Sequence, residues 1–409
     1  MTRFHSYLDY LYDTNWTPER HWRKVYKSDG TMREFIVFIM IPLLVTPYKI
    51  LVYNSQYGYS HSKFMGKIAD VLVDAGHNVS SLIPIVNTGS VDVTTKSSKI
   101  YVPQSSATAE LMKKYDAELD VFSINSLNPI GSILLGMYFS STFGSQCRAV
   151  LEETQLIEKL RDEEYDVMIT ENVDVCGTAL TELIKPKTFI LTSSSMIVGS
   201  QFEEFGIPTA MSYNPEPYIS PMNVHSMWDR LLNIYANILV RHSFGSIRTA
   251  VDALFKEKFG QTFPSVLEIS ANSAYVFVNS EPLIDFAAPT MSKVIHIGGI
   301  GAQEPKSLDE DWKDILSKRE KTVLLSFGSV TQSSKLKMPI KLSIIETVKS
   351  FPHVTFIWKY EEEDDFTMEI ASKIDNLHLT KWMPQVDLLA HPNLSLFITH
   401  GGMGSTQET

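Results

Sequence analysis

The last stretch of the chain combines a short apolar run, a glycine turn and the start of a polar helix. Residues 394–399 are rich in β-formers and lead directly into His400, Gly401 and Gly402, a pattern typical of a strand, a tight turn and a helix N-terminus. Such a turn aims backbone N–H groups outward at the positive end of a helix, where a diphosphate binds well. An imidazole at the carboxyl end of a parallel strand can also donate to a phosphate oxygen. The stretch therefore predicts a diphosphate site.

Two side chains beside this turn suit the rest of a nucleotide. Trp382, ahead of the strand, offers a flat ring for stacking a base. Glu408, within the helix start, can accept hydrogen bonds from ribose hydroxyls. Strand, glycine turn and polar helix start also occur in plain strand-to-helix connections, so the motif alone leaves an ordinary structural role open.

A second candidate position lies near the start of the pattern of alternating strands and helices. Residues 49–53 predict a first strand, and His61 follows within a serine-containing turn at the start of a helix that closes at Gly76. A histidine at the end of the first parallel strand points into the ligand crevice. The alternative is that His61, together with Ser60 and Ser62, only forms a polar cap at the N-terminus of this helix.

The combination W-x-P-Q, D-L-L-x-H-P, F-x-T-H-G-G and S-T-x-E over residues 382–408 resembles the signature of the UDP-glycosyltransferases. The animal UDP-glucuronosyltransferase group is the most similar, and the likeness extends from about Tyr48 to the last residue. It implies an α/β protein of the GT-B type, with two facing Rossmann-like domains. We expect an acceptor-binding domain over 48–301, a linker over 302–320 and a UDP-sugar-binding domain over 321–409.

The resemblance gives His61 the role of general base, which takes a proton from an alcohol or phenol as the oxygen attacks the anomeric carbon. Glu171, at the carboxyl end of a strand predicted over 165–170, matches the carboxylate that orients this base, where the family usually has Asp. Asp174 is the alternative. We favour Glu171 because it aligns with the strand end. The implied reaction is inverting transfer of a hexosyl group.

By the same resemblance, Trp382 lies against uracil, Gln385 lies near uracil or ribose, and Ser329 touches the donor diphosphate. Gly404 stands where relatives usually have Asn, so a backbone N–H must serve there alone. The expected donor-binding residues are Ser329, Trp382, Gln385, His400, Gly402, Gly404, Ser405 and Glu408.

Composition narrows the classes of partner. The 409 residues carry a net charge of −11 without a Lys/Arg block, which argues against nucleic-acid binding.

Cys147 and Cys176 are either buried thiols or one bridge. No His/Cys/Asp cluster has metal-ligand spacing, so we expect no metal and no cofactor, with the UDP-sugar as co-substrate. Residues 298–301 (GGIG) lack the spacing of a dinucleotide fingerprint, which disfavours an NAD enzyme.

The first 47 residues predict a leader. The apolar run 35–45 is too short to span a bilayer but fits the h-region of a signal peptide, with a buried strand or helix as the alternative. Asn15, Asn78 and Asn393 are glycosylation sequons. With these features, the resemblance to the UDP-glucuronosyltransferases implies a glycoprotein of the endoplasmic reticulum lumen with a role in detoxification. Full-length relatives are membrane-anchored, and this protein would be too if a C-terminal tail followed Thr409.

The implied donor is UDP-glucuronate or UDP-glucose, and the implied acceptor is a small lipophilic alcohol or phenol; homo- or hetero-oligomers are compatible with the family. The signature stops short at Thr409, so we expect a C-terminally truncated member with an incomplete second domain. Leu324, Phe356, Phe397 and Ile398 would then lack a covering layer. The alternative function is a catalytically inactive fragment that associates with full-length relatives.

The sequence also predicts the secondary structure of three further regions. Residues 146–164 are helix-like, and 228–259 form one long or kinked helical region interrupted at Gly245. Residues 193–223 predict a long loop broken by prolines. Its aromatic side chains either line an acceptor pocket or pack the loop onto the sheet: Phe202, Phe205, Tyr213 and Tyr218.

Overall fold

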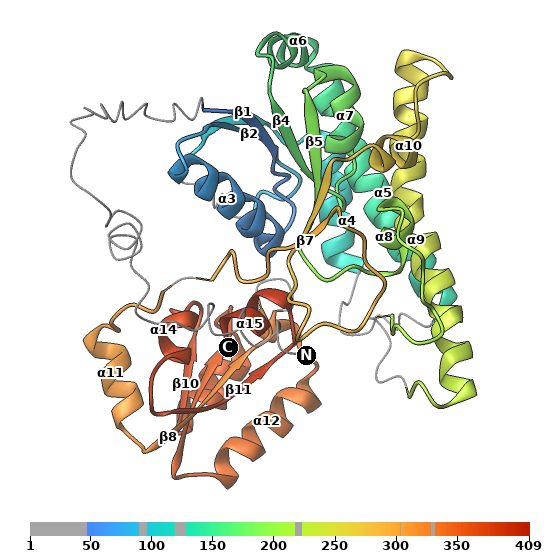
Figure 1. The fold of residues 1–409 in the computed structure, drawn as a ribbon. Helices are drawn as coiled ribbons and strands as arrows, with labels where there is room; N and C mark the ends of the chain where they lie inside the picture. Colours follow the sequence, from blue (N-terminus) through green and yellow to red (C-terminus); the bar gives the residue numbers. More distant parts are fainter. Residues whose placement is uncertain (1–46, 90–95, 119–127, 217–222, 303, 329–331) are drawn as a thin grey trace, which may run out of the picture. The chain divides into compact units, whose positions relative to one another are not determined.

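The computed structural model describes residues 47–409 except 90–95, 119–127, 217–222, 303 and 329–331 (Figure 1). Residues 47–409 group together as one compact unit by their contacts. The predicted signal peptide and the sequon at Asn15 lie outside the described residues, as do Ser329 and Tyr218.

Seven parallel strands form the first sheet, in the order β3-β2-β1-β4-β5-β6-β7. The strand order reverses beside β1, because β2 pairs with one edge of β1 and β4 with the other. Such a switch point opens a ligand crevice at the carboxyl ends of the strands. The strands are β1 (Lys49–Tyr53), β2 (Asn78–Pro84), β3 (Ser98–Val102), β4 (Val167–Glu171), β5 (Thr188–Ser193), β6 (Tyr275–Val278) and β7 (Val294–His296).

Helices cover both faces of this sheet, which explains the unbroken apolar run of β1. Leu51 and Tyr53 face a core that they share with α5 and α7, whereas Ile50 and Val52 face a second core under α3 (Figure 1). The helices are α3 (Tyr59–Asp74), α4 (Ser106–Glu118), α5 (Pro129–Glu152), α6 (Thr154–Asp162), α7 (Cys176–Ile184), α8 (Gly199–Glu204), α9 (Met227–Phe259) and α10 (Val266–Ala271).

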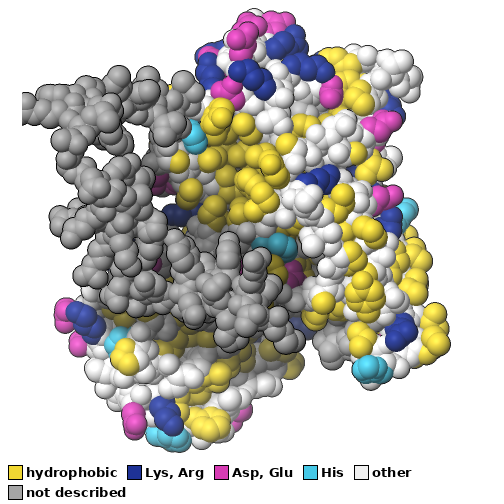
Figure 2. All heavy atoms as spheres, in the orientation of Figure 1, with side chains coloured by type: hydrophobic (Ala, Val, Ile, Leu, Met, Phe, Trp, Pro, Cys, Tyr) yellow, Lys and Arg dark blue, Asp and Glu magenta, His cyan; other side chains and the backbone are white. Residues whose placement is uncertain are grey.

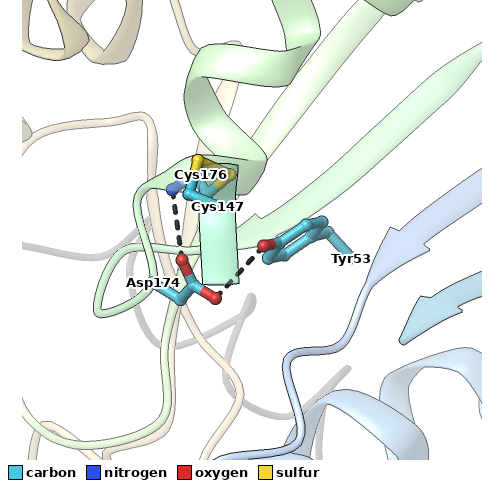
Figure 3. The surroundings of a disulfide bond; sticks show 4 residues. All are labelled: Tyr53, Cys147, Asp174 and Cys176. Atoms are coloured by element: carbon cyan, nitrogen blue, oxygen red, sulfur yellow. Dashed lines mark hydrogen bonds between the residues drawn. A yellow bond between two sulfur atoms is a disulfide. The ribbon is translucent and has the colours of Figure 1, made fainter. Parts of the chain in front are cut away.

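The two cysteines form a disulfide, which decides between the alternatives of thiols and a bridge. Cys147 of α5 is bonded to Cys176 at the start of α7, with their Cα atoms 5.6 Å apart (Figure 3). The bridge thus ties α5 to the segment that follows β4. Gly177 lies so close to Tyr53 that an added Cβ would be 2.6 Å from the ring, so this turn packs directly on the end of β1.

A second sheet of four parallel strands has the order β10-β9-β8-β11. Its strands are β8 (Lys321–Ser326), β9 (Val354–Lys359), β10 (Leu377–Thr380) and β11 (Leu394–Thr399), and its helices are α11 (Glu310–Ser317), α12 (Met338–Ser350), α13 (Asp365–Glu369), α14 (Gln385–Leu389) and α15 (Met403–Glu408). Side chains alternate between two cores, under α12 on one face and under α11 and α14 on the other. Two parallel sheets with helical crossovers confirm the predicted α/β class.

The predicted lack of a covering layer is wrong for two of the four side chains named above. Leu324 and Phe356 are buried, because Leu324 packs in the core with α11 and α14, and Phe356 in the core with α12. On the edge strand β11, Phe397 is half-buried, whereas Leu396 and Ile398 are exposed.

Two helices in the structure differ from those predicted from the sequence. Residues 146–164 belong to two helices, because Glu153 (φ −76°, ψ 60°) separates α5 from α6. The helix α9 continues through Gly245 without a break. This helix runs along α5, and Gly136 of α5 approaches the backbone of Ser243 in α9 so closely that an added Cβ would lie 2.9 Å from it. The packing of α9 against α5 outweighs the poor helix propensity of Gly245.

The segment after β5 is not a continuous loop, because it contains α8. Phe202 and Phe205 are buried in a core with β5 and β6, so the packing alternative is correct for these two rings, whereas Tyr213 is exposed. The predicted serine cap of α3 is wrong. Gly58 is the N-cap residue without a side-chain bond, and Ser62 instead donates to the Ser55 carbonyl, 3.2 Å away.

Basic and acidic side chains are mixed on the visible face, with both signs gathered over α6 at the top of Figure 2. Among the helices that the structure describes, none combines the length and the apolar character needed to cross a membrane.

Candidate active site

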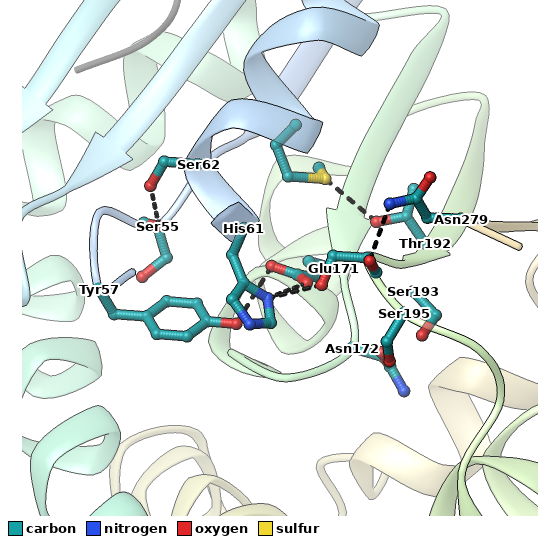
Figure 4. A network of polar contacts seen from close by, with 12 residues as sticks. Ser55, Tyr57, His61, Ser62, Glu171, Asn172, Thr192, Ser193, Ser195 and Asn279 are labelled. Atoms are coloured by element: carbon teal, nitrogen blue, oxygen red, sulfur yellow. Dashed lines mark hydrogen bonds and ion pairs between the residues drawn. The ribbon is translucent and has the colours of Figure 1, made fainter. Parts of the chain in front are cut away.

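Three neighbouring strands of the first sheet deliver polar side chains to one place at their carboxyl ends. His61 lies in the first turn of α3, which follows β1, and Glu171 is the last residue of β4. Ser194 follows directly after β5. Because β1, β4 and β5 are consecutive and parallel in the sheet, their ends meet at one edge (Figure 4).

His61 and Glu171 are in direct contact. The His61 Nδ1 atom lies 2.5 Å from Glu171 Oε1. Glu171 is 4% exposed, whereas the His61 side chain remains partly accessible. Tyr57 supports the pair, because its ring lies 4.6 Å from the imidazole and its hydroxyl donates a long hydrogen bond of 3.4 Å to Glu171 Oε2. An imidazole that donates its Nδ1–H to a carboxylate presents Nε2 as a base.

The alternative carboxylate, Asp174, has different partners. It accepts hydrogen bonds from the Tyr53 hydroxyl at 3.1 Å and from the Cys176 N–H at 3.2 Å (Figure 3). Burial raises the pKa of Asp174 to about 6, with the hydrogen bonds from the Cys176 N–H and the Tyr53 hydroxyl opposing the rise. The structure therefore brings Glu171, and not Asp174, against His61.

Ser194 is a site residue that the sequence reasoning missed. Its Oγ atom lies 2.6 Å from His61 Nδ1. The Asn279 side chain, just after β6, donates to the Ser194 carbonyl at 2.9 Å. The available signal was its position: a serine directly after a predicted parallel strand faces the same crevice as the histidine and glutamate.

On the second sheet, His400 packs among glycines. A Cβ added to Gly402 would lie 2.4 Å from His400 Nε2, and one added to Gly328 would lie 2.7 Å from its Cε1. Gly401 adopts φ +73°, which favours glycine. Burial, together with the nearby Lys359 ammonium, lowers the pKa of His400. The lowered pKa favours the neutral imidazole, which donates through one ring N–H.

Lys359, the last residue of β9, is a second residue that sequence reasoning missed. Its ammonium donates to the Gly328 carbonyl at 2.6 Å and lies 5.2 Å from the centre of the Trp382 ring. Burial lowers the pKa of Lys359, and Glu361 opposes this effect. Trp382 is 61% exposed, so one large aromatic surface is open beside a cation.

The remaining donor residues that the structure describes gather around α15. Gln385 Nε2 donates to Glu408 Oε2 at 2.8 Å and to Ser405 Oγ at 3.3 Å. Glu408 Oε1 also accepts from Lys63 of α3 at 2.9 Å. A Cβ added to Gly404 would meet nothing within 4 Å, so the structure leaves room for a side chain at this position. Ser329 lies outside the described residues.

Polar and acidic groups near these sites form no metal cluster. Within the part of the chain that the structure describes, no group of three His, Cys, Asp or Glu side chains could hold a metal ion.

Comparison with known proteins gives consistent matches over the described unit. A family model described as "UDP-glucoronosyl and UDP-glucosyl transferase" matches residues 48–409. The Caenorhabditis elegans relative named ugt-48 is 30% identical over 381 residues, which is 91% of this chain and 72% of that relative.

Solved structures share the fold at low sequence identity. A glycotransferase of kitacinnamycin aligns with a TM-score of 0.56 at 16% identity, covering 88% of this chain and 78% of that one. UGT2 of Phytolacca americana, solved with UDP-2fluoro-glucose and pterostilbene, aligns with a TM-score of 0.52 at 16% identity, covering 88% and 77%.

Proposed function

The chain belongs to the UDP-glucuronosyl and UDP-glucosyl transferase family, and we propose that it transfers a glucuronosyl or glucosyl group from a UDP-sugar to the hydroxyl of a small lipophilic alcohol or phenol, with inversion at the anomeric carbon. The protein has the GT-B glycosyltransferase fold. The observation that carries the finer proposal is the contact between His61 and Glu171 at the carboxyl edge of the first sheet.

In this proposal, His61 is the general base. Glu171 accepts the Nδ1–H and holds the ring in the tautomer whose Nε2 can take a proton. A hydroxyl with a pKa well above 7 needs such a base, because its alkoxide or phenoxide is scarce at neutral pH. The imidazolium that forms is stabilised by the buried Glu171 carboxylate.

The departing UDP would be received by the second sheet. The base would stack on Trp382, the ribose would meet Glu408, and the diphosphate would meet His400 and the backbone N–H groups of the turn at Gly402. Oriented N–H donors stabilise the charge that builds on the leaving group, and the proposed reaction uses no metal or other cofactor. The Phytolacca americana structure, which holds a UDP-sugar analogue and a small molecule, supports these substrate classes.

We also propose that the protein resides in the endoplasmic reticulum lumen after removal of residues 35–45 with the leader. The Cys147–Cys176 disulfide supports an oxidising compartment. Asn78 is exposed, whereas Asn393 donates to the Leu316 carbonyl at 3.0 Å, so a glycan is expected at Asn78. N-terminal sequencing of the secretory product should find a start near residues 46–48; retention of residues 1–31 would reject this proposal.

The direct test of the function is a transfer assay with defined products. The chain is incubated with UDP-glucose or UDP-glucuronate and 4-nitrophenol, and the product is identified by mass spectrometry and by the proton coupling of its anomeric centre. We expect a β-glycoside from the α-configured donor. An α-glycoside would reject inversion. UDP binding by titration without any transfer would reject the enzymatic role of this chain and favour a non-catalytic protein that associates with related transferases.

A further inference from the structure

We propose that Ser194 is a positioning residue for the His61 base, which completes a three-residue group with Glu171. The inference rests on the proposed function. Its basis is that the same nitrogen, His61 Nδ1, lies 2.5 Å from Glu171 Oε1 and 2.6 Å from Ser194 Oγ. Two oxygens at hydrogen-bond distance compete for, or share, a single ring position.

The protonation state of His61 Nδ1 determines whether the Glu171 and Ser194 oxygens share this nitrogen or compete for it. When Nδ1 carries a proton, Glu171 and the Ser194 oxygen can both accept from it. When Nδ1 carries a lone pair, Ser194 could donate to it, but the carboxylate oxygen would then face that lone pair without a proton between them. An ionised acceptor makes the stronger hydrogen bond, so the buried Glu171 selects the protonated Nδ1 and Ser194 becomes its second acceptor.

The fold holds the serine oxygen in place. Ser194 is 9% exposed, and its carbonyl accepts from the Asn279 side chain, which follows the next strand, β6. Its register is set by β4 and β5, in which Glu171 pairs with Thr192. Three neighbouring strand ends therefore fix both acceptors relative to the imidazole. This should restrict rotation of the ring and keep Nε2 directed at the acceptor hydroxyl.

A positioning role predicts a specific kinetic pattern. Ser194→Ala should lower kcat by roughly two- to twelvefold, the range of one hydrogen bond, while the KM values for donor and acceptor change less than about twofold. Ser194→Thr keeps the hydroxyl and should recover most of the loss. Ser195→Ala is the matched control, because the Ser195 hydroxyl bonds the Met196 carbonyl and not the histidine; its kcat should equal that of the parent.

A second readout does not depend on transfer. In the chain labelled with ¹⁵N-histidine, the His61 signal, assigned by its loss in His61→Gln, should show the proton on Nδ1. Exchange of this proton with water should accelerate in Ser194→Ala and return to the parental rate in Ser194→Thr. A proton on Nε2 in the parent, or unchanged kcat and exchange in Ser194→Ala, would overturn the proposal. Absence of transfer with the predicted Nδ1 signals would instead refute only the proposed function.

Discussion

Replacing Asp174 by Asn should stabilise the protein, and the gain should grow with pH. Asp174 is 2% exposed, and burial raises its pKa from 3.8 to about 6. A raised pKa in the folded state means that the stability present below about pH 3.8 is lost as the pH rises through 6. The difference of about 2.2, at about 1.4 kcal/mol per pKa unit, corresponds to roughly 3 kcal/mol. Asn is neutral throughout and avoids this loss.

The assay is urea unfolding of the parent and Asp174→Asn at pH 4.5, 5.5, 6.5 and 7.5, followed by tryptophan fluorescence. The variant should already gain about 1 kcal/mol at pH 4.5, and the gain should rise to roughly 3 kcal/mol above pH 6.5. Turnover should stay near the parental value, because Asp174 bonds Tyr53 and not His61. A pH-independent stability difference would refute the reasoning about burial. Loss of turnover in Asp174→Asn, with parental turnover in Glu171→Gln, would transfer the orienting role to Asp174.

Two further changes follow from the geometry. Replacing Cys147 and Cys176 together by Ala removes a bridge across 29 positions, and the chain-entropy relation predicts a loss of roughly 3 to 4 kcal/mol in the free energy of unfolding; an equal urea midpoint for the variant and the oxidised parent would contradict this. Gly402→Ala places a Cβ 2.4 Å from His400 Nε2 and should weaken UDP binding by roughly tenfold or more in calorimetric titration, whereas Gly301→Ala, whose Cβ meets nothing within 4 Å, should bind UDP like the parent.

The main strands could be predicted from the sequence because their apolar runs are short and bounded by polar or glycine residues. The run 49–53 is β1 as expected, and 394–399 is β11. Tertiary packing explains the misses. The helix α9 continues through Gly245 because it lies along α5, and no periodicity within residues 228–259 contains that information. Likewise, the 29-residue separation of Cys147 and Cys176 says nothing about their distance in the fold.

Two residues of the candidate site could be predicted from one rule, that side chains at the carboxyl ends of parallel strands share a crevice. This rule, with the family signature, selected His61 and Glu171. It could not rank Ser194 among the neighbouring serines, because its contact with His61 depends on the register of β5 against β4. Lys359 was missed because a lysine at the end of an apolar strand is usually an ordinary solvated side chain. Its proximity to the Trp382 ring is known only from the fold.

The most direct test of the central claim compares the parent with His61→Ala on phenols of graded acidity, under saturating UDP-sugar. If His61 is the base, the variant should lose roughly 10²- to 10⁴-fold in turnover on phenol itself. The loss should shrink on 4-nitrophenol, which is substantially ionised near neutral pH, and UDP affinity should be unchanged. Near-parental turnover of His61→Ala on phenol, or a loss that is the same for every acceptor, would contradict the account.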